Sequence, residues 1–551
     1  MKDALSTLEA SYTTLMREDE SDCLDIEAFL ERHSKIIDTY EELITQKYIA
    51  FQRDTANQLY EEELDFVQTN IKPLLSKFKH EMDQKTLQYI GDKPDYIRLR
   101  EKLNSKQKSY SESNTAVRLK EDQLVNRYLK ITGGLTSPSN QNQDLNDLYN
   151  LLYDKNEDVR ERAFCNIALA YEGIEQDVNL IFDQLINLRI KKADNVGLNA
   201  FSEYAFTELG RTDYTPKNCR EIAGAIKQYF LPIKEKLQRE QENYLGKKYL
   251  SPWDSKVSPY SDITNVYGDS EDVLLETVGN ILRKIDPYFY TVFNELHSKR
   301  NFDLKPRANK APGGFSEFLP ASRESFIFMN LTGTFDDLVI LMHEIGHAIH
   351  HDLIKDIPFS EDKRITMEVA EFAAMSLELL SMEHWNLAVT DQFSLYQAKM
   401  EHFRLIVEFL PQTIIVDQFQ DWVYHHPTHS HEERRKKFES LTDMYDTGVV
   451  DWGTVSAWKG QEWMSVIHIF ETPFYYIEYA IAQIAALQLF MNYKKNPMET
   501  LERFKRALAM GNSRSVTEIY ELAGVKFDFS EATLHPLTQF ITSELEAIHP
   551  E

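Results

Sequence analysis

The sequence LVILMHEIGHAIHH, residues 338–351, is the most informative stretch of this 551-residue chain. It is largely apolar and lacks proline, so we predict an α-helix over it. His343 and His347 are four residues apart, which places both imidazoles on one face of the helix, one turn apart. Both rings can then reach a single tetrahedral ion, while Glu344 is placed to contact a water molecule beside that ion. The motif therefore predicts a zinc site on a helix.

The context of the motif argues against a chance match, which a chain of this composition would produce at a rate on the order of a few per cent. Thr334 and Asp337 form a Thr-x-x-Asp pattern, which predicts a capped start of the helix. Gly346 lowers helix stability by about 1 kcal/mol relative to alanine, so we expect another segment to approach closely there. His350 lies on the ligand face, but a packed histidine is its more common role.

A third protein ligand is expected, because catalytic zinc takes three protein ligands and leaves a fourth position for water. The stretch from Thr366 to Glu378 is again apolar with helical spacing. Glu371 and Glu378 are seven residues apart and share one face, and Glu368 lies close to Glu371. Spacing alone does not choose among the three. It predicts one glutamate as a ligand and a neighbour that orients a ligand histidine.

A second group of histidines follows further along the chain, at His425, His426, His429 and His431 around Pro427. The proline breaks the helical register, and the spacing is not that of a known ligand set. We therefore expect a turn here rather than a second metal site.

Composition and charge narrow the class of protein. Hydrophobic residues make up 42% of the chain and aromatic residues 12%, which is enough to bury a large core and excludes disorder as the main state. The formal net charge is −27, from 61 basic and 88 acidic residues. Such a surface repels phosphate backbones, so we expect no nucleic-acid partner.

The cysteines and the apolar segments bear on location. Cys23, Cys165 and Cys219 are few, odd in number and far apart, which argues against a disulfide framework and favours a reducing compartment. They also make a thiolate zinc site implausible, so histidine and carboxylate ligands are expected. The N-terminus has no apolar signal region and no window of 18 apolar residues occurs, so we expect a cytoplasmic chain without a membrane span.

Helical spacing dominates the rest of the chain, and the fold class is predicted as mainly α with a small β-sheet. The first 130 residues read as long charged helices, with a kink or restart at Pro73. The stretch from Thr132 to Asn140 is rich in Gly, Pro, Ser and Asn and predicts a linker. Residues 301–325 read as irregular. The best strand prediction is Phe326–Leu331, which is short, apolar and partly β-branched.

Several of these segments resemble the thimet oligopeptidase and oligoendopeptidase F family of zinc metallopeptidases, and most closely its shorter oligoendopeptidase F-like (Pz-peptidase-like) branch. The resemblance covers residues from about 200 to 490. It is carried by five segments: His343–His350 together with Glu371 in AEFA, Gly210–Pro216 (GRTDYTP), Ser251–Asp254 (SPWD), Phe326–Gly333, and Trp463–Gln488 with its HIFETPFYYIEYA sequence.

The resemblance implies features that spacing does not give. It makes Glu371 the third zinc ligand. It implies a mainly α, two-lobed gluzincin-type metallopeptidase with a deep channel and a small β-sheet near the metal helix. The chain would divide into an N-terminal helical region (residues 1–132), a helical connecting region (133–200) and a catalytic zinc-peptidase domain (201–551). The strand at 326–329 would pair with the substrate backbone.

The resemblance also implies that residues of the late His/Tyr segment line the catalytic face opposite the metal. We favour His468, Tyr476 and Tyr479 as the residues that contact the transition state, with Tyr475 as the alternate. Adjacent residues of a helix cannot all face one cleft, so some of these aromatic rings are expected in the core instead.

Together these points predict a zinc-dependent endopeptidase that hydrolyses internal bonds of short oligopeptides, with one Zn²⁺ per chain and Glu344 as general base. A zinc exopeptidase is an alternative, although the aminopeptidase-type Gly-x-Met-Glu-Asn segment does not occur. A non-catalytic scaffold stabilised by zinc is a further alternative, but structural zinc usually fills all four positions with protein groups. The sequence does not predict an oligomeric state.

Overall fold

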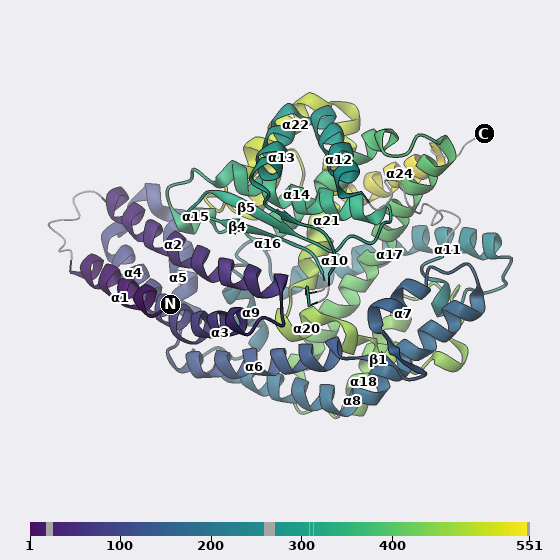
Figure 1. Cartoon of the computed structure of the whole chain (residues 1–551), viewed down its shortest axis with the longest axis horizontal. Helices are drawn as coiled ribbons and strands as arrows, with labels where there is room; N and C mark the ends of the chain where they lie inside the picture. Colours follow the sequence, from purple (N-terminus) through teal and green to yellow (C-terminus); the bar gives the residue numbers. More distant parts are fainter. Residues whose placement is uncertain (18–25, 258–269, 308, 312, 548–551) are drawn as a thin grey trace.

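Helices dominate the computed structural model, as the sequence predicts, and two small sheets accompany them (Figure 1). The structure describes residues 1–17, 26–257, 270–307, 309–311 and 313–547. Cys23 and Pro312 lie outside these residues. Among the helices described, none combines the length and the apolar character needed to traverse a lipid bilayer.

The first part of the chain folds into helices at one end of the molecule, shown in purple in Figure 1. They are α1 (Lys2–Met16), α2 (Ile26–Arg53), α3 (Gln58–Phe66), α4 (Lys72–Ile90) and α5 (Ile97–Ser109), with a π-helical turn η1 (Val67–Ile71) before α4. Pro73 stands in the first turn of α4, directly after the π-helical turn, so the predicted kink or restart takes the form of a π-turn within a run that stays helical from α3 to α4. These helices bury a core of their own, which includes Leu8, Phe29 and Val67.

Two long helices, α6 (Ser113–Gly133) and α8 (Glu157–Asp194), run along the lower edge of Figure 1. Between them lie β1 (Thr136–Ser137), β2 (Asn140–Asp144) and α7 (Leu145–Leu151). The two strands pair antiparallel, so the predicted break near residue 134 is a tight hairpin. A second core begins here and continues to Leu545, and it joins most of the later helices into one packed body. The three-part division of the chain stays a prediction.

The later part of the chain forms a further series of helices. They are α9 (Phe201–Glu208), α10 (Pro216–Tyr229), α11 (Leu231–Leu245), α12 (Glu271–Ile285), α13 (Pro287–Lys299), α15 (Ser360–Lys363), α17 (Gln392–His425), α18 (His431–Met444), α19 (Trp458–Gln461), α20 (Ile467–Glu471), α22 (Pro497–Leu508), α23 (Val516–Ala523) and α24 (Glu531–Ala547). Short 3₁₀ turns connect them: η2 (Pro94–Tyr96), η3 (Pro252–Asp254), η4 (Met382–Leu387), η5 (Gly453–Val455) and η6 (Glu462–Ser465).

A three-stranded sheet lies beside the predicted metal helix, as expected. Its strands are β3 (Phe302–Asp303), β4 (Phe315–Leu319) and β5 (Glu324–Phe328), in the order β3-β5-β4. The predicted strand at Phe326–Leu331 exists but begins two residues earlier. β4 was not predicted, because glycine and proline residues precede it. β5 pairs parallel with β3 and antiparallel with β4.

The central position of β5 corrects one expectation. Both of its edges are already hydrogen bonded: Ile327 N–H and Met329 N–H donate to Asn301 O and Asp303 O on one side, and β4 pairs with the other side. A substrate strand therefore has no free edge at residues 326–329, and that prediction is wrong. The outer strand on this side is β4.

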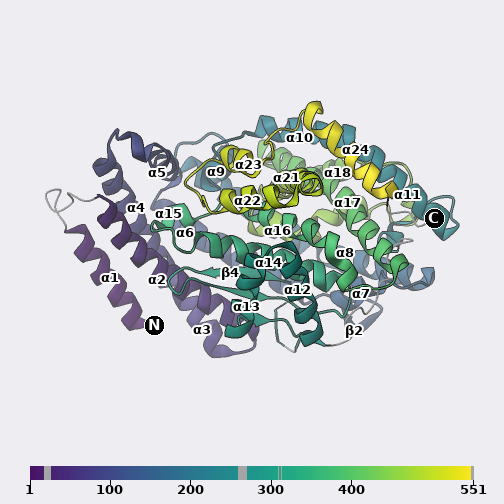
Figure 2. The same ribbon diagram turned by 90° about the horizontal axis from the view of Figure 1, so that it is seen from above.

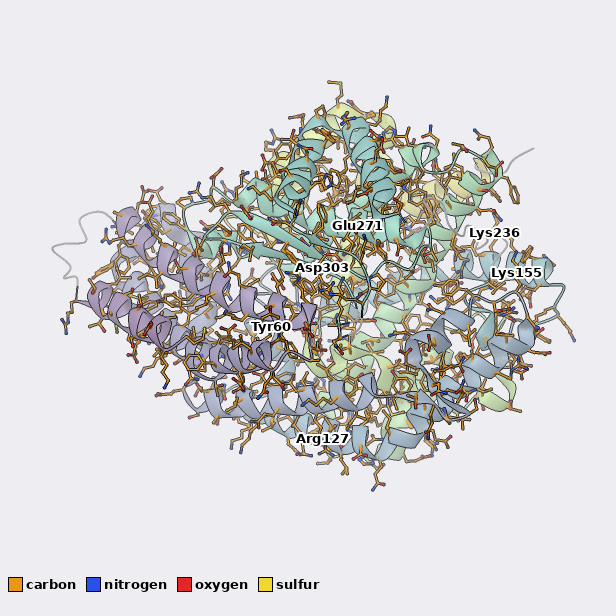
Figure 3. All side chains as sticks on the ribbon, viewed as in Figure 1. Tyr60, Arg127, Lys155, Lys236, Glu271 and Asp303 are labelled. Atoms are coloured by element: carbon orange, nitrogen blue, oxygen red, sulfur yellow. The ribbon has the colours of Figure 1, made fainter. Side chains whose placement is uncertain are left out.

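One carboxylate helps to tie the N-terminal helices to the sheet. Asp303, on β3, accepts hydrogen bonds from Arg53 Nε at the end of α2 (2.7 Å) and from Arg307 Nη1 (2.6 Å). Figure 3 labels Asp303 near the middle of the view, where α2 ends against the sheet. The surrounding cations hold the pKa of Asp303 below its usual range, although burial opposes them. This charge cluster fixes α2 beside the sheet.

Three helices form the centre of the molecule: α14 (Asp336–Ile354), α16 (Met367–Ser381) and α21 (Tyr476–Lys495). Figure 2 shows them one beside the next, with α16 between the other two. A Cβ added at Gly346 on α14 would lie 2.6 Å from Ala374 Cα on α16, which is too close for any side chain. The predicted close approach at Gly346 is therefore confirmed, and it brings α16 against the ligand helix.

The predicted helix cap is wrong. α14 begins at Asp336, with Phe335 as its N-cap residue and no side-chain cap. The carboxylate of Asp337 turns back to the preceding loop instead, where it accepts hydrogen bonds from Thr332 N–H and Gly333 N–H. It stabilises the loop that leads from the sheet into α14.

Candidate metal centre

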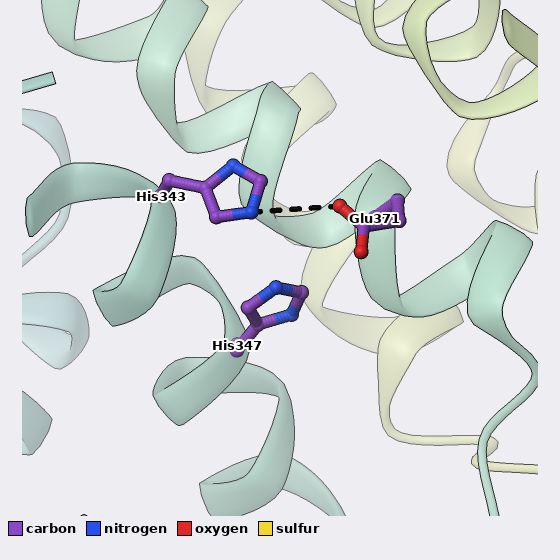
Figure 4. Close-up of side chains that lie close together, drawn as sticks. All are labelled: His343, His347 and Glu371. Carbon is purple, nitrogen blue, oxygen red and sulfur yellow. Dashed lines mark ion pairs between the residues drawn. The ribbon is translucent and has the colours of Figure 1, made fainter. Parts of the chain in front are cut away.

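Two elements bring the three predicted ligands together. His343 and His347 stand one turn apart on α14, with ring centroids 4.9 Å apart, and Glu371 faces them from α16. One ligand atom of each residue lies within 4.8 Å of the others (Figure 4). The dashed line in Figure 4 joins His343 Nε2 to Glu371 Oε2, 3.4 Å apart. This His, His, Glu group converges on one point.

The unpaired atoms of this group fit a cation. Glu371 Oε2 and Glu344 Oε2 are buried and have no hydrogen-bond partner in the protein. A buried carboxylate oxygen without a donor is costly, so such an atom needs a positive partner or water. Two imidazole nitrogens and one carboxylate oxygen are also the donor set of many catalytic zinc sites. The residues therefore fit a zinc ion with one open position.

The geometry distinguishes Glu368, Glu371 and Glu378, among which sequence spacing could not choose the third ligand. Glu371 belongs to the converging group. Glu378 Oε1 lies 2.6 Å from His343 Nδ1, so it orients that ring and leaves Nε2 facing Glu371. Glu368 instead accepts a hydrogen bond from Tyr214 Oη at 2.6 Å. Glu368 therefore has a structural contact rather than a place in the ligand group.

Glu344 is buried beside the predicted ligands. Burial raises the pKa of Glu344 to about 7, although the neighbouring His343 opposes this shift. A Cβ at Gly314 would lie 3.5 Å from Glu344 Oε1, so the loop before β4 passes close to the carboxylate. Gly314 was only part of an irregular segment in the sequence, and its role depends on this close contact.

The late His/Tyr segment forms one aromatic cluster against the ligands. Tyr475 Oη donates to Glu371 Oε1 at 2.7 Å. The His468 ring stacks on Tyr475 with centroids 5.1 Å apart, and Tyr479 meets the Tyr475 ring edge-on at 5.0 Å. Tyr476 packs against Tyr479 at 5.7 Å. All four predicted residues are therefore close together, and Tyr475 is the one that bonds a ligand directly.

The charges around the tyrosines also distinguish Tyr475 and Tyr479 from Tyr476. Burial and then the charge of Glu371 raise the pKa of Tyr475 and Tyr479 far above the usual range. For Tyr476, burial and the charge of Glu462 raise the pKa to about 12. The charge of Glu371 thus acts on Tyr475 and Tyr479, whereas Tyr476 is influenced by Glu462 instead. Adjacency in the sequence did not reveal this, because α21 begins only at Tyr476.

The other histidines singled out in the sequence do not belong to the converging group of His343, His347 and Glu371. His350 is fully buried, and burial lowers its pKa to about 3. His425 and His426 end α17, with each Nδ1 close to a main-chain carbonyl one turn earlier. His431 begins α18, with its Nε2 2.7 Å from Asp183. The predicted turn at residues 425–431 is confirmed.

Comparison with known proteins decides the family. The model of Peptidase family M3 matches residues 150–538, which is more than half of the chain. The chain belongs to peptidase family M3. It is therefore a metallopeptidase that acts on peptides, as members of this metal-dependent family do. The resemblance found in the sequence is confirmed.

Individual M3 relatives agree with this assignment. An oligoendopeptidase F homologue of Borreliella burgdorferi is 24% identical over 490 residues, covering 85% of this chain and 80% of the relative. A structure of PZ peptidase A with an inhibitor has a TM-score of 0.90 at 22% identity, covering 99% of this chain and 97% of the other. Oligoendopeptidase F from Enterococcus faecium has a TM-score of 0.66 at 15% identity, covering 99% and 96%. These structures share the M3 fold.

Proposed function

We propose that this M3 peptidase is a zinc-dependent endopeptidase of short oligopeptides, with one Zn²⁺ held by His343, His347 and Glu371. The observation that carries the proposal is the convergence of these three residues within 4.8 Å, with a buried carboxylate oxygen that has no protein partner. Glu378 supports it by fixing the ring of His343 at 2.6 Å.

Glu344 is proposed as the general base. When bound, zinc polarises the scissile carbonyl and lowers the pKa of a water molecule toward about 7. Glu344 accepts the proton of that water and later passes it to the leaving amine. Its free Oε2 supports this role, because no protein donor competes for it.

Tyr479 and His468 are proposed as hydrogen-bond donors to the tetrahedral oxyanion, while Tyr475, whose single hydroxyl proton is donated to Glu371 Oε1, is proposed to hold that carboxylate in place. Both phenols stay protonated at neutral pH, because burial raises their pKa. Burial lowers the pKa of His468 to about 4, so its ring is neutral and keeps one N–H to donate. Tyr476 comes second to Tyr475, since the contact with Glu371 belongs to Tyr475.

The peptide is proposed to bind along β4. This strand is the outer member of the sheet next to β5, so an extended peptide can add to it through main-chain hydrogen bonds. Gly314, beside Glu344, leads directly into the strand, which would place a bound peptide close to the general base. We also propose a deep channel between two lobes, which would admit short peptides and exclude folded proteins. The small number of cysteines supports a cytoplasmic location.

A defined peptide pool tests this function. Purified protein is incubated with a mixture of short peptides. Products are identified by mass spectrometry, and the zinc bound to the protein is measured in the same sample. We expect internal fragments as first products and one zinc bound per chain. Casein, offered in a parallel incubation as a full-length protein substrate, is expected to stay intact. Free amino acids as first products would favour a zinc exopeptidase. Tightly folded, zinc-loaded protein that cleaves nothing would favour the scaffold alternative.

A further inference from the structure

The main chain between His468 and Tyr475 is anchored by two buried arginines from distant parts of the sequence. We propose that Arg189 and Arg211, called here the carbonyl anchor, are positioning residues that hold His468 and Tyr475 in place for the reaction. This inference rests on the proposed function of the two residues. Among the described residues, neither arginine forms a hydrogen bond or an ion pair with His343, His347, Glu371 or Glu344.

Arg211 holds the residue that precedes Tyr475. Its side chain lies in the loop between α9 and α10 and is about 1% exposed. Nη2 donates to the main-chain carbonyl of Phe474 at 2.5 Å and to Glu478 Oε1 at 2.6 Å, and Nε donates to the same Glu478 oxygen at 3.1 Å. Glu478 belongs to α21, so Arg211 joins the start of this helix to the turn before it.

Arg189 holds the chain just after His468. It comes from α8, is fully buried and pairs with Glu121 of α6 at 2.7 Å. Nη1 donates to Ile469 O at 2.9 Å, and Nη2 donates to Phe470 O. The last carbonyls of a helix have no partner within the helix. In α20, which ends at residue 471, Arg189 satisfies two of them.

Phe474 shows why an anchor is required. Its φ of +67° is in the left-handed region, which residues with a side chain rarely adopt. Such a conformation costs on the order of 1 kcal/mol and persists only where its surroundings enforce it. Here Gln420 Oε1 accepts from Phe474 N–H at 3.0 Å and Arg211 donates to Phe474 O. This turn directs the next side chain, Tyr475, onto Glu371.

Arginine suits this task better than lysine does. Its planar guanidinium presents several donors in a fixed fork, so one group can bind a carboxylate and a carbonyl at once. Lysine keeps the charge but offers a compact ammonium on a flexible stem. An Arg→Lys change therefore keeps Glu121 or Glu478 paired with a cation while loosening the carbonyls. This change separates geometry from charge.

Arg160 provides a matched control. It is also about 1% exposed, binds two main-chain carbonyls, Asp154 O at 2.8 Å and Lys155 O at 3.0 Å, and pairs with a carboxylate, Asp254 Oδ1, at 2.6 Å. None of these partners belongs to the segment between His468 and Tyr475. Arg160→Lys thus reproduces the loss of stability without loosening that segment.

The first test compares turnover in the zinc-loaded protein. Arg189→Lys and Arg211→Lys are expected to lower kcat by about 10-fold or more with KM changed by less than about 3-fold, because misplaced donors weaken transition-state contacts rather than binding. Arg160→Lys is expected to lower the melting temperature by a similar amount and to keep kcat. Equal effects of Arg160→Lys and Arg211→Lys on kcat would overturn the proposal.

The second test needs no peptide cleavage. Tyr475→Phe removes the hydrogen bond to Glu371 and is expected to weaken zinc binding about 10-fold, measured by chelator competition. Arg211→Lys should weaken it similarly in the wild-type background and cause no further change in the Tyr475→Phe background. Additive effects would show that Arg211 does not act through Tyr475 and would overturn the proposal.

The two tests keep the inference separate from the proposed function. A protein that binds zinc but cleaves no peptide would refute the proposed function. The comparison of zinc affinity in Arg211→Lys, Tyr475→Phe and the double variant would still test whether the carbonyl anchor positions Tyr475. If Arg211→Lys does not fold, Gln420→Met replaces it, because this change releases the other side of Phe474 without leaving a buried charge. It should then show the same lack of additivity with Tyr475→Phe.

Discussion

The hydroxyl of Tyr475 donates to Oε1 of Glu371 across 2.7 Å, which joins α21 to the ligand group on α14 and α16. The other oxygen of Glu371 is left free to face His343 at 3.4 Å. One tyrosine thus fixes which oxygen of the carboxylate points to the metal position. This contact connects the aromatic cluster of the late segment to the metal centre.

Removing this hydroxyl should impair turnover. Tyr475→Phe is expected to lower kcat by about 10–100-fold, because Glu371 loses the hydrogen bond that fixes its orientation. Tyr476→Phe removes a hydroxyl from the neighbouring residue, which packs on Tyr479 and lacks the contact with Glu371, so a smaller loss is expected. Steady-state kinetics on a quenched peptide measures both. A larger loss for Tyr476→Phe would reverse the assignment made here.

Glu378 should control metal affinity rather than the chemical step. Glu378→Gln keeps the shape of the side chain but weakens its interaction with His343 Nδ1, which lies 2.6 Å from Oε1. A loss of about 10–100-fold in zinc affinity is expected, with activity recovered in excess zinc. Competition with a chromogenic chelator measures the affinity. Unchanged affinity would show that the ring of His343 is oriented by other contacts.

Gly346 should tolerate no side chain. Gly346→Ala places a methyl group 2.6 Å from Ala374 Cα, and overpacking of this kind typically costs about 1–3 kcal/mol. Gly224→Ala on α10 is the matched control, because a Cβ there meets no atom within 4 Å. It should raise stability by up to about 1 kcal/mol. Urea unfolding of the metal-free proteins compares them, and equal stability of the two variants would contradict the close packing.

The N-terminal core should weaken in mild acid. His33 is buried, and burial lowers its pKa to about 3, so it is neutral in the folded protein. The unfolded chain takes up this proton near pH 6.5. The unfolded state therefore binds more protons below pH 6.5, and stability falls as the pH drops from about 6.5 toward 3.

A variant isolates this effect. His33→Phe should reduce the pH dependence of the free energy of unfolding by up to about 1.4 kcal/mol per pH unit within that range. The aromatic ring keeps the edge contact that His33 makes with Tyr12, whose ring centroid lies 5.8 Å away. Urea unfolding at several pH values gives the two slopes. The same slope in both proteins would show that His33 stays protonated in the fold.

The sequence predicted what depends on local spacing. The helix with His343, Glu344 and His347 follows from hydrophobic periodicity, and the helix distortion next to Pro73 from the chemistry of proline. The choice of Glu371 over Glu378 could not come from spacing, because both share one helix face. It depends on the distance between α14 and α16, which Gly346 sets.

Other features depend on contacts between distant segments. β4 follows a glycine-rich stretch and becomes a strand only by pairing with β5. Thr334 matched a capping pattern, yet Asp337 is used by the loop before the helix. Arg189 meets Ile469 from 280 positions earlier in the chain, and no local pattern marks such a contact. Sequence reasoning therefore named the candidate ligands but not the arginines that hold the segment between His468 and Tyr475.

The most direct test of the central claim is the rate of peptide cleavage by zinc-loaded Glu344→Gln protein relative to the wild type. Glutamine keeps the size of the side chain but cannot accept the proton of the attacking water at neutral pH. The account predicts a loss of at least about 10³-fold with one zinc still bound per chain. Wild-type turnover by this variant would contradict it.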